Sequence, residues 1–567
     1  MNQYRIDQIK LTPDEEQAVQ QKNGEEIFAS KIRRILEKAG ISDRGANEIE
    51  KIQILRRSID GRGGEVHFVY ALAFDSRRTI PAGKMKRAGI REYREADAYR
   101  WPEPGNGRLA GRPVVVGFGP CGMFCALVLA EAGYRPLVIE RGEDVETRTR
   151  KVERFWQDGV LDPECNVQFG EGGAGTFSDG KLNTGVKDPR IRFVLETFVQ
   201  AGADADILID ARPHIGTDRL RVVVKNIRER IEQLGGEIRF GTRLDELEVE
   251  AGKITGIRVS RAAAGMKTGG REEDGQKAVK DVDPSVDPSI EAGRISASIS
   301  CQALVLALGH SARDTVRTLY AQGIAMEPKP FSMGVRVQHP QEVIDRANYG
   351  QAYGHPSLPP AYYKLAYRAA DGRGVYSFCM CPGGEIVCAS SQEGGVVTNG
   401  MSNRRRDSGQ ANSGILVDVR ISDFPDTADP LSGIALQEEY ERRAYRNAGG
   451  RYKPPETTYG QLQAGEASQV AASLPDFVLH DLLEAMPEFG RKIKGFDAPE
   501  TVIKAIESRS SSPVRILRDR ETLQAEPGFY PAGEGAGYAG GITSAACDGI
   551  KIAEQIIQGF ARPDESD

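Results

Sequence analysis

The stretch VVVGFGPCGMFCALVLAEAGYRPLVIER, residues 114–141, is the most apolar part of the chain and carries three glycines and a proline near its start. A membrane-spanning helix needs about 20 consecutive apolar residues, and Gly117, Gly119 and Pro120 interrupt this run. The pattern instead predicts a buried strand, a glycine-rich turn, a helix that ends at Gly133 and a second strand. The stretch therefore indicates an α/β unit and not a membrane span.

The glycines of this stretch follow the spacing G-x-G-x-x-G at Gly117, Gly119 and Gly122. In such a turn the first glycine allows the tight bend, the second lets a pyrophosphate reach the backbone, and the third lets the helix pack on the strand. The helix N-terminus then attracts phosphate. Glu140 ends the second strand, where an acid binds ribose hydroxyls. The motif predicts a dinucleotide cofactor, and the charge of Glu140 disfavours the 2′-phosphate of NADP.

A second glycine-rich turn, YPAGEGAGYAGGITSAACDGIKIAE at residues 530–554, decides which dinucleotide is expected. It follows a short apolar strand and leads into a helix from about Thr543. The N-terminus of that helix favours a group that gains negative charge, as the N1–C2 region of a flavin does on reduction. Glu534 is placed to bind a ribityl hydroxyl. These features predict FAD, because a nicotinamide enzyme needs no such turn.

The two motifs together resemble the FAD-binding fold of the glutathione reductase type, and residues 305–312, VLALGHSA, resemble the strand and turn that return to the cofactor in that fold. Five stretches together resemble the large bacterial family of uncharacterised FAD-dependent dehydrogenases, which is distantly related to geranylgeranyl reductase-like and aminoacetone oxidase-like flavoproteins. These stretches are QFGEGGAGTFSDGKLNTG (168–185), FSMGVRVQHP (331–340), FCMCPGG (378–384), VVTNGMS (396–402) and GEGAGYAGGITSAA (533–546). The resemblance covers nearly the whole chain and implies FAD as the cofactor.

The glycine-rich loop 170–185 is expected to lie against the flavin, with Thr176 and Ser178 on the phosphates or the flavin edge and Lys181 near N1–C2 or a phosphate. The resemblance to the fold places the adenine near Arg243 and Leu244. The predicted FAD-binding residues are Gly117, Gly119, Pro120, Gly122, Glu140, Arg141, Gly172, Gly173, Gly175, Thr176, Ser178, Lys181, Arg243, Leu244, Gly309, Gly533, Glu534, Gly540, Gly541 and Ile542.

Three residues are candidates for catalysis. Cys379 and Cys381 are two apart, so on a strand they share a face. They are either a redox dithiol beside the flavin or two thiols packed under the turn at Pro382. No further cysteine or histidine stands near enough to complete a metal site, and no metal is expected. His310 is either a general acid or base or a cap of the helix that begins near Ala312.

The periodic patterns along the chain predict an α/β fold with three parts. A glutathione reductase-type, Rossmann-like FAD-binding domain carries an inserted mixed α+β substrate domain and follows a small N-terminal α+β domain. The expected boundaries are 1–97 for the N-terminal domain, 110–324 with 501–562 for the discontinuous FAD-binding domain, and 325–500 for the substrate domain. Residues 262–294 lack aromatics and are expected to be a disordered loop insertion.

Composition bounds the partners and the compartment. The chain has 567 residues and a net charge of −6, which disfavours nucleic acid and membranes as partners of the whole protein. Its eight cysteines are too few for a disulfide framework in a chain of this length. The first ten residues contain no apolar core of a secretory signal. A cytoplasmic location is therefore expected.

These observations predict an FAD-dependent dehydrogenase that transfers a hydride between FAD and an unidentified small molecule or NAD(P)H. Only one full dinucleotide fingerprint is visible, so NAD(P)H is expected only as a transient donor. Two alternatives stay open. The first is a flavin-dependent RNA-modifying protein that binds RNA through the basic segment 76–100, although a solvated connection is the simpler interpretation of that segment. The second is a non-catalytic flavin redox sensor.

Overall fold

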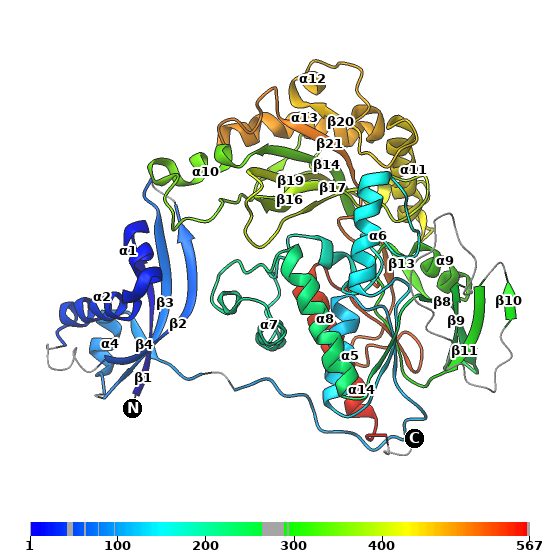
Figure 1. The fold of residues 1–567 in the computed structure, drawn as a ribbon, viewed down its shortest axis with the longest axis horizontal. Coiled ribbons are helices and arrows are strands. Elements are labelled where there is room, and N and C mark those ends of the chain that lie inside the picture. Colours follow the sequence, from blue (N-terminus) through cyan, green and yellow to red (C-terminus); the bar gives the residue numbers. More distant parts are fainter. Residues whose placement is uncertain are drawn as a thin grey trace.

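The computed structural model describes residues 2–41, 49–61, 64–77, 79–95, 97–262, 289–291 and 294–563. The chain forms three parts (Figure 1). A small N-terminal domain lies to one side, an α/β domain with a parallel sheet lies at the lower right, and a domain built on an antiparallel sheet lies above it. Within the described residues, no helix has both the length and the apolar character that a membrane crossing requires.

The N-terminal domain packs helices on an antiparallel sheet of order β2-β3-β1-β4. Its core side chains include Leu11, Ile32 and Leu72, all fully buried. The basic segment after residue 76 is not only a connection, because it contains a short helix and the edge strand of this sheet. The elements are β1 (Asn2–Leu11), α1 (Pro13–Ala18), η1 (Val19–Asn23), α2 (Gly24–Lys38), β2 (Ile49–Asp60), β3 (His67–Ser76), α4 (Ala82–Ala88) and β4 (Ile90–Glu92).

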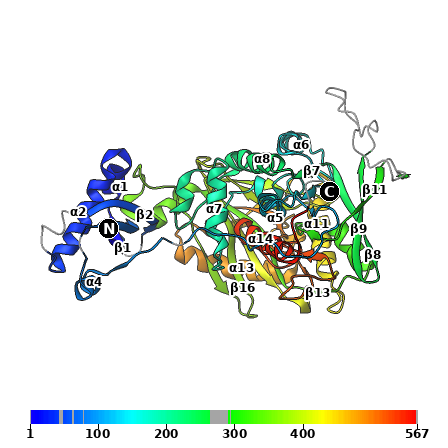
Figure 2. The ribbon, with the colours of Figure 1, turned by 90° about the horizontal axis from the view of Figure 1, so that it is seen from below.

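The N-terminal domain contacts the α/β domain through an ion pair at Arg57 and the antiparallel-sheet domain through Asp14, which lies 3.1 Å from His355. Arg57 on β2 contacts Asp210 with two hydrogen bonds, of 2.7 Å from Nε and 3.1 Å from Nη2. The backbone N–H of Arg57 also donates to the carbonyl of Ile209, at 2.7 Å, and its carbonyl accepts from Ala211, at 2.8 Å. The domain is therefore held by more than the extended segment that links it to the rest of the chain (Figures 1 and 2).

The α/β domain is built on a parallel sheet of order β23-β12-β5-β6-β7, which confirms the predicted α/β class. Its strands are β5 (Val114–Val116), β6 (Leu137–Ile139), β7 (Glu237–Arg239), β12 (Leu304–Leu306) and β23 (Phe529–Pro531). A second, antiparallel sheet has the order β10-β11-β9-β8, from β8 (Thr242–Glu250), β9 (Lys253–Ala262), β10 (Ser289–Glu291) and β11 (Arg294–Ser300). The predicted loop insertion falls mostly on residues 263–288, which lie outside the described residues.

The position of helix α5 (Pro120–Glu131), which follows β5, explains why residues 114–141 are so apolar. Residues 121–130 of this helix are all buried, because it lies between the sheet and other helices and has no solvent-facing side. The C-terminal helix crosses it so closely that a Cβ at Gly549 would come within 2.0 Å of the carbonyl oxygen of Cys121. The helices of the domain are α5 (Pro120–Glu131), α6 (Val145–Asp158), η2 (Gly173–Phe177), α7 (Arg190–Gln200), η3 (Ala205–Leu208), α8 (Thr217–Gln233), α9 (Arg313–Ala321) and α14 (Ile542–Gly559).

The inserted domain, called the cap domain below, is built on a six-stranded antiparallel sheet of order β15-β16-β19-β14-β21-β20. Its strands and the small hairpin beside it are β14 (Phe331–Pro340), β15 (Ala366–Arg368), β16 (Gly374–Pro382), β17 (Glu385–Cys388), β18 (Thr398–Met401), β19 (Gln410–Val419), β20 (Glu456–Thr458) and β21 (Val502–Glu507). The predicted boundary at residue 501 differs from this arrangement, because β21 belongs to the cap sheet. The boundary lies after Glu507, where the chain turns back to the α/β domain.

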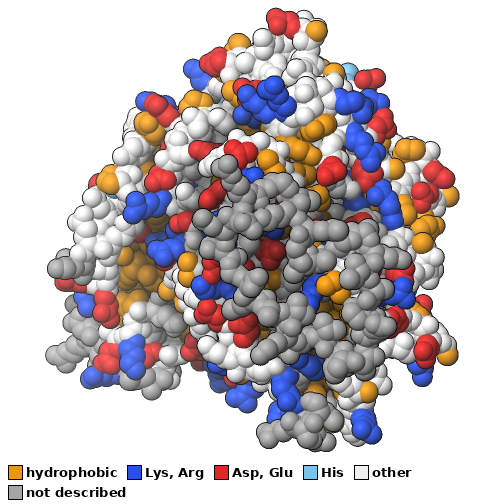
Figure 3. Space-filling view, turned by 45° about the vertical axis from the view of Figure 1, so that its right-hand side comes forward, with side chains coloured by type: hydrophobic (Ala, Val, Ile, Leu, Met, Phe, Trp, Pro, Cys, Tyr) orange, Lys and Arg blue, Asp and Glu red, His pale blue; other side chains and the backbone are white. Residues whose placement is uncertain are grey.

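Helices cover the cap sheet, and α13 packs against β14, β15, β16 and β19. The helices are α10 (Gln341–Tyr349), η4 (Gly350–Ala352), η5 (Ile421–Asp423), α11 (Ser432–Asn447), α12 (Tyr459–Gln463), η6 (Ala471–Ser473) and α13 (Asp476–Lys492). The chain enters the cap domain after β13 (Met326–Pro328) and leaves it before β22 (Val514–Ile516). These two strands pair with each other in a small antiparallel sheet. On the face drawn in Figure 3, acidic and basic side chains are interspersed.

A buried ion cluster fastens the cap domain to the α/β domain. Glu441 on α11 accepts hydrogen bonds from Arg313 on α9, at 2.8 and 2.9 Å, and from Arg509, at 2.7 and 3.0 Å. All three side chains are at most 4% exposed. Burial alone would raise the pKa of the Glu441 carboxyl, but the two guanidinium groups hold that pKa well below its ordinary value. The carboxylate is thus ionised where the domains meet.

Glu441→Gln is expected to lower the free energy of unfolding by about 3–5 kcal/mol, because it leaves two buried guanidinium groups without their anion. A matched control is Glu439→Gln, on the same helix, which breaks an exposed pair with Arg443 and should cost under about 1 kcal/mol. The folded-state pKa of Glu441 is depressed, so its contribution is present above the unfolded pKa of about 4.3 and is lost as the pH falls below it. Chemical unfolding at neutral and acidic pH measures both effects, and equal losses for the two variants at neutral pH would contradict the role of the cluster.

Candidate functional site

A cavity of about 440 Å³ lies at the carboxyl ends of β5, β6, β12 and β23. Ligands of open α/β sheets bind at this edge, outside the carboxyl ends of the strands. The turns that follow the four strands line one side of the cavity, the glycine-rich loop after residue 170 lines a second side, and the cap domain closes a third. The site is therefore formed by segments far apart in the sequence.

The three glycines of the first motif have different surroundings. Gly117 has a φ of +100°, and a Cβ there would lie 2.6 Å from the carbonyl oxygen of Ala307. A Cβ at Gly122 would lie 1.9 Å from the carbonyl oxygen of Gly117. At Gly119, in contrast, a Cβ would meet only the Cα of Gly173, at 3.7 Å. The fold thus requires the first and third glycines, whereas the second borders open space in the cavity.

The backbone at two helix N-termini fits the charged parts of FAD. In the described part of the chain, no side chain caps the first turn of α5 or of α14, and both helices begin at the cavity. A Cβ built at Gly309 or Gly540 meets no atom within 4 Å. The cavity thus offers bare backbone and free N–H groups where a pyrophosphate and a flavin need them.

Glu140 is held by three backbone N–H groups. Its Oε2 accepts from Phe118, at 2.9 Å, and its Oε1 accepts from Gly142, at 2.9 Å, and from Gly170, at 3.0 Å. A carboxylate offers about four acceptor positions, so one position on Oε2 is left for a ribose hydroxyl. The sequence predicted binding to both hydroxyls, whereas the structure gives Glu140 a structural role as well.

The glycine-rich loop contributes Gly173, Gly175, Ser178 and Lys181 to the cavity wall. Thr176 does not match the prediction that it bonds a phosphate or the flavin. Its side chain is 1% exposed, and its Oγ1 donates to the carbonyl of Glu171, at 3.2 Å. The hydroxyl is used inside the loop, where the carbonyl of Glu171 accepts from it.

The structure brings most of the predicted residues to one cavity. Those that line it are Gly117, Gly119, Pro120, Glu140, Arg141, Gly173, Gly175, Ser178, Lys181, Arg243, Leu244, Gly309, His310, Cys379, Glu534, Gly540, Gly541 and Ile542. Those that do not are Gly122, Gly172, Thr176, Cys381 and Gly533. The three glycines in this second group serve close packing, since a Cβ at any of them would approach another atom to within 3.0 Å.

His310 forms a dyad with Glu534. The imidazole Nδ1 lies 2.9 Å from Oε1 of Glu534, and the imidazole is 9% exposed. Among the described residues, Nε2 of this ring is buried and has no hydrogen-bond partner. The alternative of a helix cap is not observed, because α9 begins after Ala312 with no side-chain cap. Glu534 was expected to bind the ribityl chain, and one of its oxygens is instead used by the histidine.

The cap domain adds a wall that sequence reasoning missed. Phe378, Thr398, Asn399, Glu507 and Ser510 line the cavity. Glu507 is fully paired with the buried Arg336, whose Nε and Nη2 donate at 2.5 and 2.8 Å. Two of the motifs that carry the family resemblance contain residues of this wall, but the wall itself forms only when β18 and β21 come together.

Arg509 also reaches the cavity, but its guanidinium is committed. Besides Glu441, it donates to the hydroxyls of Ser311, at 2.8 Å, and Ser391, at 2.6 Å. Arg515, six residues further along the chain, pairs with Glu327 at 3.0 Å. An arginine in a cavity wall can anchor a substrate or form a structural ion pair, and the contacts of Arg509 favour the ion pair.

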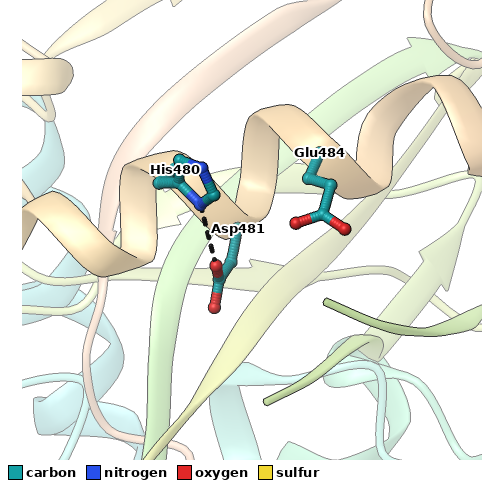
Figure 4. A group of neighbouring side chains, drawn as sticks. All are labelled: His480, Asp481 and Glu484. Atoms are coloured by element: carbon teal, nitrogen blue, oxygen red, sulfur yellow. Dashed lines mark hydrogen bonds and ion pairs between the residues drawn. The ribbon is translucent and has the colours of Figure 1, made fainter. Parts of the chain in front are cut away.

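One further cluster of metal-binding residue types, His480, Asp481 and Glu484, lies on α13 away from the cavity (Figure 4). His480 turns to Asp481 at 3.1 Å, whereas Glu484 accepts from the hydroxyl of Tyr367, at 2.7 Å, and from the N–H of Ala370. These bonds give the cluster a structural role on the surface of the cap domain.

Comparison with known proteins identifies two regions of the chain. Residues 330–473 match a family model described as "FAD-dependent protein, C-terminal domain-like", and residues 3–75 match a domain of unknown function, DUF8436. The first description confirms the FAD dependence predicted from the sequence. The chain is 40% identical over 582 residues to an uncharacterized protein of Clostridium beijerinckii, with 99% of each chain covered.

Two solved structures were also compared. The first is a geranylgeranyl bacteriochlorophyll reductase-like protein from Thermoplasma acidophilum, with 11% identity, 79% and 78% of the two chains covered and a TM-score of 0.33. The second is the glycerol-3-phosphate dehydrogenase of Bacillus halodurans complexed with FAD, with 10% identity, 80% and 66% covered and a TM-score of 0.32.

The surroundings of the glycines predict that Gly119→Ala and Gly122→Ala, which each add one methyl group, act differently. Gly119→Ala should weaken FAD binding at least about tenfold, equal to about 1.4 kcal/mol, with little effect on the unfolding of the apoprotein. Gly122→Ala should also destabilise the apoprotein by about 1–3 kcal/mol, because its Cβ would clash with backbone. Flavin titration and chemical unfolding of both apoproteins test this. If Gly119→Ala binds FAD as the wild type does, the cofactor does not pass this glycine.

Proposed function

We propose that this chain, which belongs to the same family as the Clostridium beijerinckii protein, is an FAD-dependent oxidoreductase that transfers a hydride between a small organic molecule and FAD. The observation that carries this proposal is the His310–Glu534 dyad in the wall of a cavity suited to a dinucleotide, where the second ring nitrogen of His310 has no hydrogen-bond partner among the described residues. A redox sensor without turnover needs no oriented proton acceptor at this place.

The residues that would hold FAD follow from the cavity wall. The pyrophosphate would bind at Gly119 and the N-terminus of α5, with a ribose hydroxyl on Glu140 and the adenine beside Arg243 and Leu244. The flavin would lie against the N-terminus of α14. When bound there, FAD supplies the centre that accepts or gives the hydride.

The dyad can move a proton while the hydride is transferred. When Nδ1 of His310 carries the proton and donates a hydrogen bond to Glu534, Nε2 is left as the acceptor of the ring. A hydroxyl or amine of the substrate could give its proton to Nε2 as the adjacent C–H bond breaks. Glu534 stabilises the imidazolium that results and keeps the ring in place.

The cap wall bounds the class of substrate. The charges of Glu507 and Arg509 are each opposed by a buried partner, so the wall presents polar groups without an uncompensated charge. Phe378 adds an apolar surface. A small, polar, weakly charged molecule fits this wall better than a strongly anionic one.

Two roles considered from the sequence receive different support. NAD(P)H as a transient donor is compatible with the described residues, in which the single full fingerprint is that of β5 and α5. RNA modification through residues 76–100 has little support, because α4 and β4 belong to the N-terminal domain and lie away from the parallel sheet of the α/β domain (Figures 1 and 2), whose strand ends line the cavity.

The test begins with the protein purified in its native fold. We expect it to contain FAD or to take it up, and to lose its yellow colour under anaerobic conditions with NADH, NADPH or one of a panel of small alcohols, amines and hydroxy acids. A preparation that stays colourless after incubation with FAD would contradict the proposal. Bound flavin that no donor bleaches would favour the redox sensor.

His310→Gln is expected to slow the reduction of the flavin by the donor so identified by about 10²–10⁴-fold, because the proton acceptor is lost. Glu534→Gln should slow it less. FAD content should be unchanged in His310→Gln, which separates a chemical role from a binding role. His480→Gln, an exposed histidine of the cap domain, is the control and should reduce at the wild-type rate. Stopped-flow absorbance measures all four proteins, and an unimpaired His310→Gln would remove the dyad from the mechanism.

A further inference from the structure

Cys379 stands at an irregular place in β16. The register between β16 and β19 shifts between Phe378 and Cys381, and Cys379 has a φ of +44°, in the left-handed region that residues other than glycine seldom occupy. Bulges of this kind re-aim side chains next to active sites. Here the bulge places Cys379 in the cavity wall, whereas Cys381 lies fully buried behind it.

A lysine from the other domain meets this pair. Nζ of Lys181, from the glycine-rich loop, lies 3.9 Å from Sγ of Cys381 and 3.6 Å from Asp179. The buried Arg336 donates to the carbonyl of Cys379, at 3.2 Å. The charged groups around the two thiols are thus Lys181 and Arg336, with Asp179 and Glu507 of opposite sign.

The two thiols differ from the other six cysteines. All eight are free, and burial raises the pKa of Cys121, Cys125, Cys165, Cys301, Cys388 and Cys547. The thiol of Cys381 donates to the backbone carbonyl of Cys379, at 3.2 Å. The pKa of Cys379 is lowered by the neighbouring side chain of Cys381 and by Lys181 and Arg336, although burial opposes this. The side chain of Cys379 and burial raise the pKa of Cys381. The pair therefore favours one thiolate and one thiol.

We propose that Cys379 and Cys381 form a redox dithiol that exchanges two electrons with the flavin. The inference rests on the proposed function, since it needs FAD in the cavity that Cys379 lines. The cap domain would thus supply a second redox group beside the flavin. Disulfide reductases carry their cysteine pair after the helix that follows the first glycine-rich turn, and this chain has no such pair there.

The exchange balances without a further reactant. The thiolate of Cys379 and the thiol of Cys381 lose two electrons and one proton, and an S–S bond forms between their sulfur atoms. FAD bound in the cavity would take up the electron pair and the proton. In the opposite direction the reduced cofactor would return both, the S–S bond would break, and the thiolate and thiol would be restored. Lys181 stabilises the negative charge on the sulfur in either direction.

The first experiment maps the thiols in the FAD-loaded protein. The protein is oxidised with glutathione disulfide, one half is then reduced anaerobically with dithionite, and each half is denatured, alkylated with iodoacetamide and analysed by mass spectrometry. We expect Cys379 and Cys381 to be protected after oxidation and labelled after reduction, with Cys388 labelled throughout. Flavin-free protein treated in the same way should keep the pair protected.

The outcomes separate the parts of the inference. If Cys379 and Cys381 stay labelled after oxidation, no dithiol couple exists and the proposal is overturned. If the pair is reduced equally fast with and without FAD, the exchange with the flavin is overturned. A protein that binds no FAD overturns the proposed function and the exchange together, and its visible spectrum reveals this before any thiol is mapped.

Electron counting gives an independent readout that does not depend on turnover. In anaerobic dithionite titration the oxidised wild type should take up twice as many electrons per FAD as Cys379→Ser or Cys381→Ser. Cys388→Ser, a buried cysteine in the same domain, is the matched control and should titrate as the wild type does. Uptake that is equal in all four proteins would contradict the proposal even if one variant folds poorly, because the count is made per bound FAD.

Lys181→Met tests the cation beside the thiols. Without Lys181 less of Cys379 is thiolate, so alkylation of Cys379 in the reduced protein near neutral pH should slow by about tenfold. Lys187→Met, in the same segment but outside the cavity wall, should react as the wild type does. An unchanged rate in Lys181→Met would show that the lysine does not activate the pair.

Discussion

The carboxylate of Glu140 is the interaction on which the site depends. Through Phe118, Gly142 and Gly170 it binds the turn after β5, the turn after β6 and the start of the glycine-rich loop. These three segments meet only at the edge of the parallel sheet, and none of their N–H groups at this point belongs to a strand ladder. Because a buried N–H without an acceptor is costly, the carboxylate fixes the turns before any cofactor binds. The acid of the fingerprint is thus part of the framework.

The cap domain completes the site from the opposite side. Its sheet takes β21 from the chain just before the final return to the α/β domain, so Glu507 and Arg509 stand where the two domains meet. The Glu441 cluster lies behind Arg509 and crosses the same junction. The cavity therefore has one wall of backbone turns and one wall of paired polar side chains, which suits a cofactor on the first and a substrate on the second.

Much of this arrangement could be predicted from local sequence. The glycine spacing, Glu140 at a strand end and the second glycine turn each reflect constraints within one short segment. They predict the α/β fold and most of the cavity residues that the turns after the parallel strands supply. The pairing of His310 with Glu534, the cap wall at Glu507 and the bulge at Cys379 depend on contacts between distant segments, and no local pattern encodes them. Thr176 differs from its prediction because of a local contact: its hydroxyl donates to the carbonyl of Glu171 within the same loop.

The docking of the small N-terminal domain through Arg57 has a mechanical consequence. Asp210, which Arg57 holds, is followed closely by residues 213–215, and these pair with the backbone of Gly180 and Leu182 on either side of Lys181. A few residues of main chain thus connect Asp210, where the N-terminal domain is docked, to Lys181 beside the thiols. A displacement of the N-terminal domain would therefore reach Lys181 through a short run of main chain.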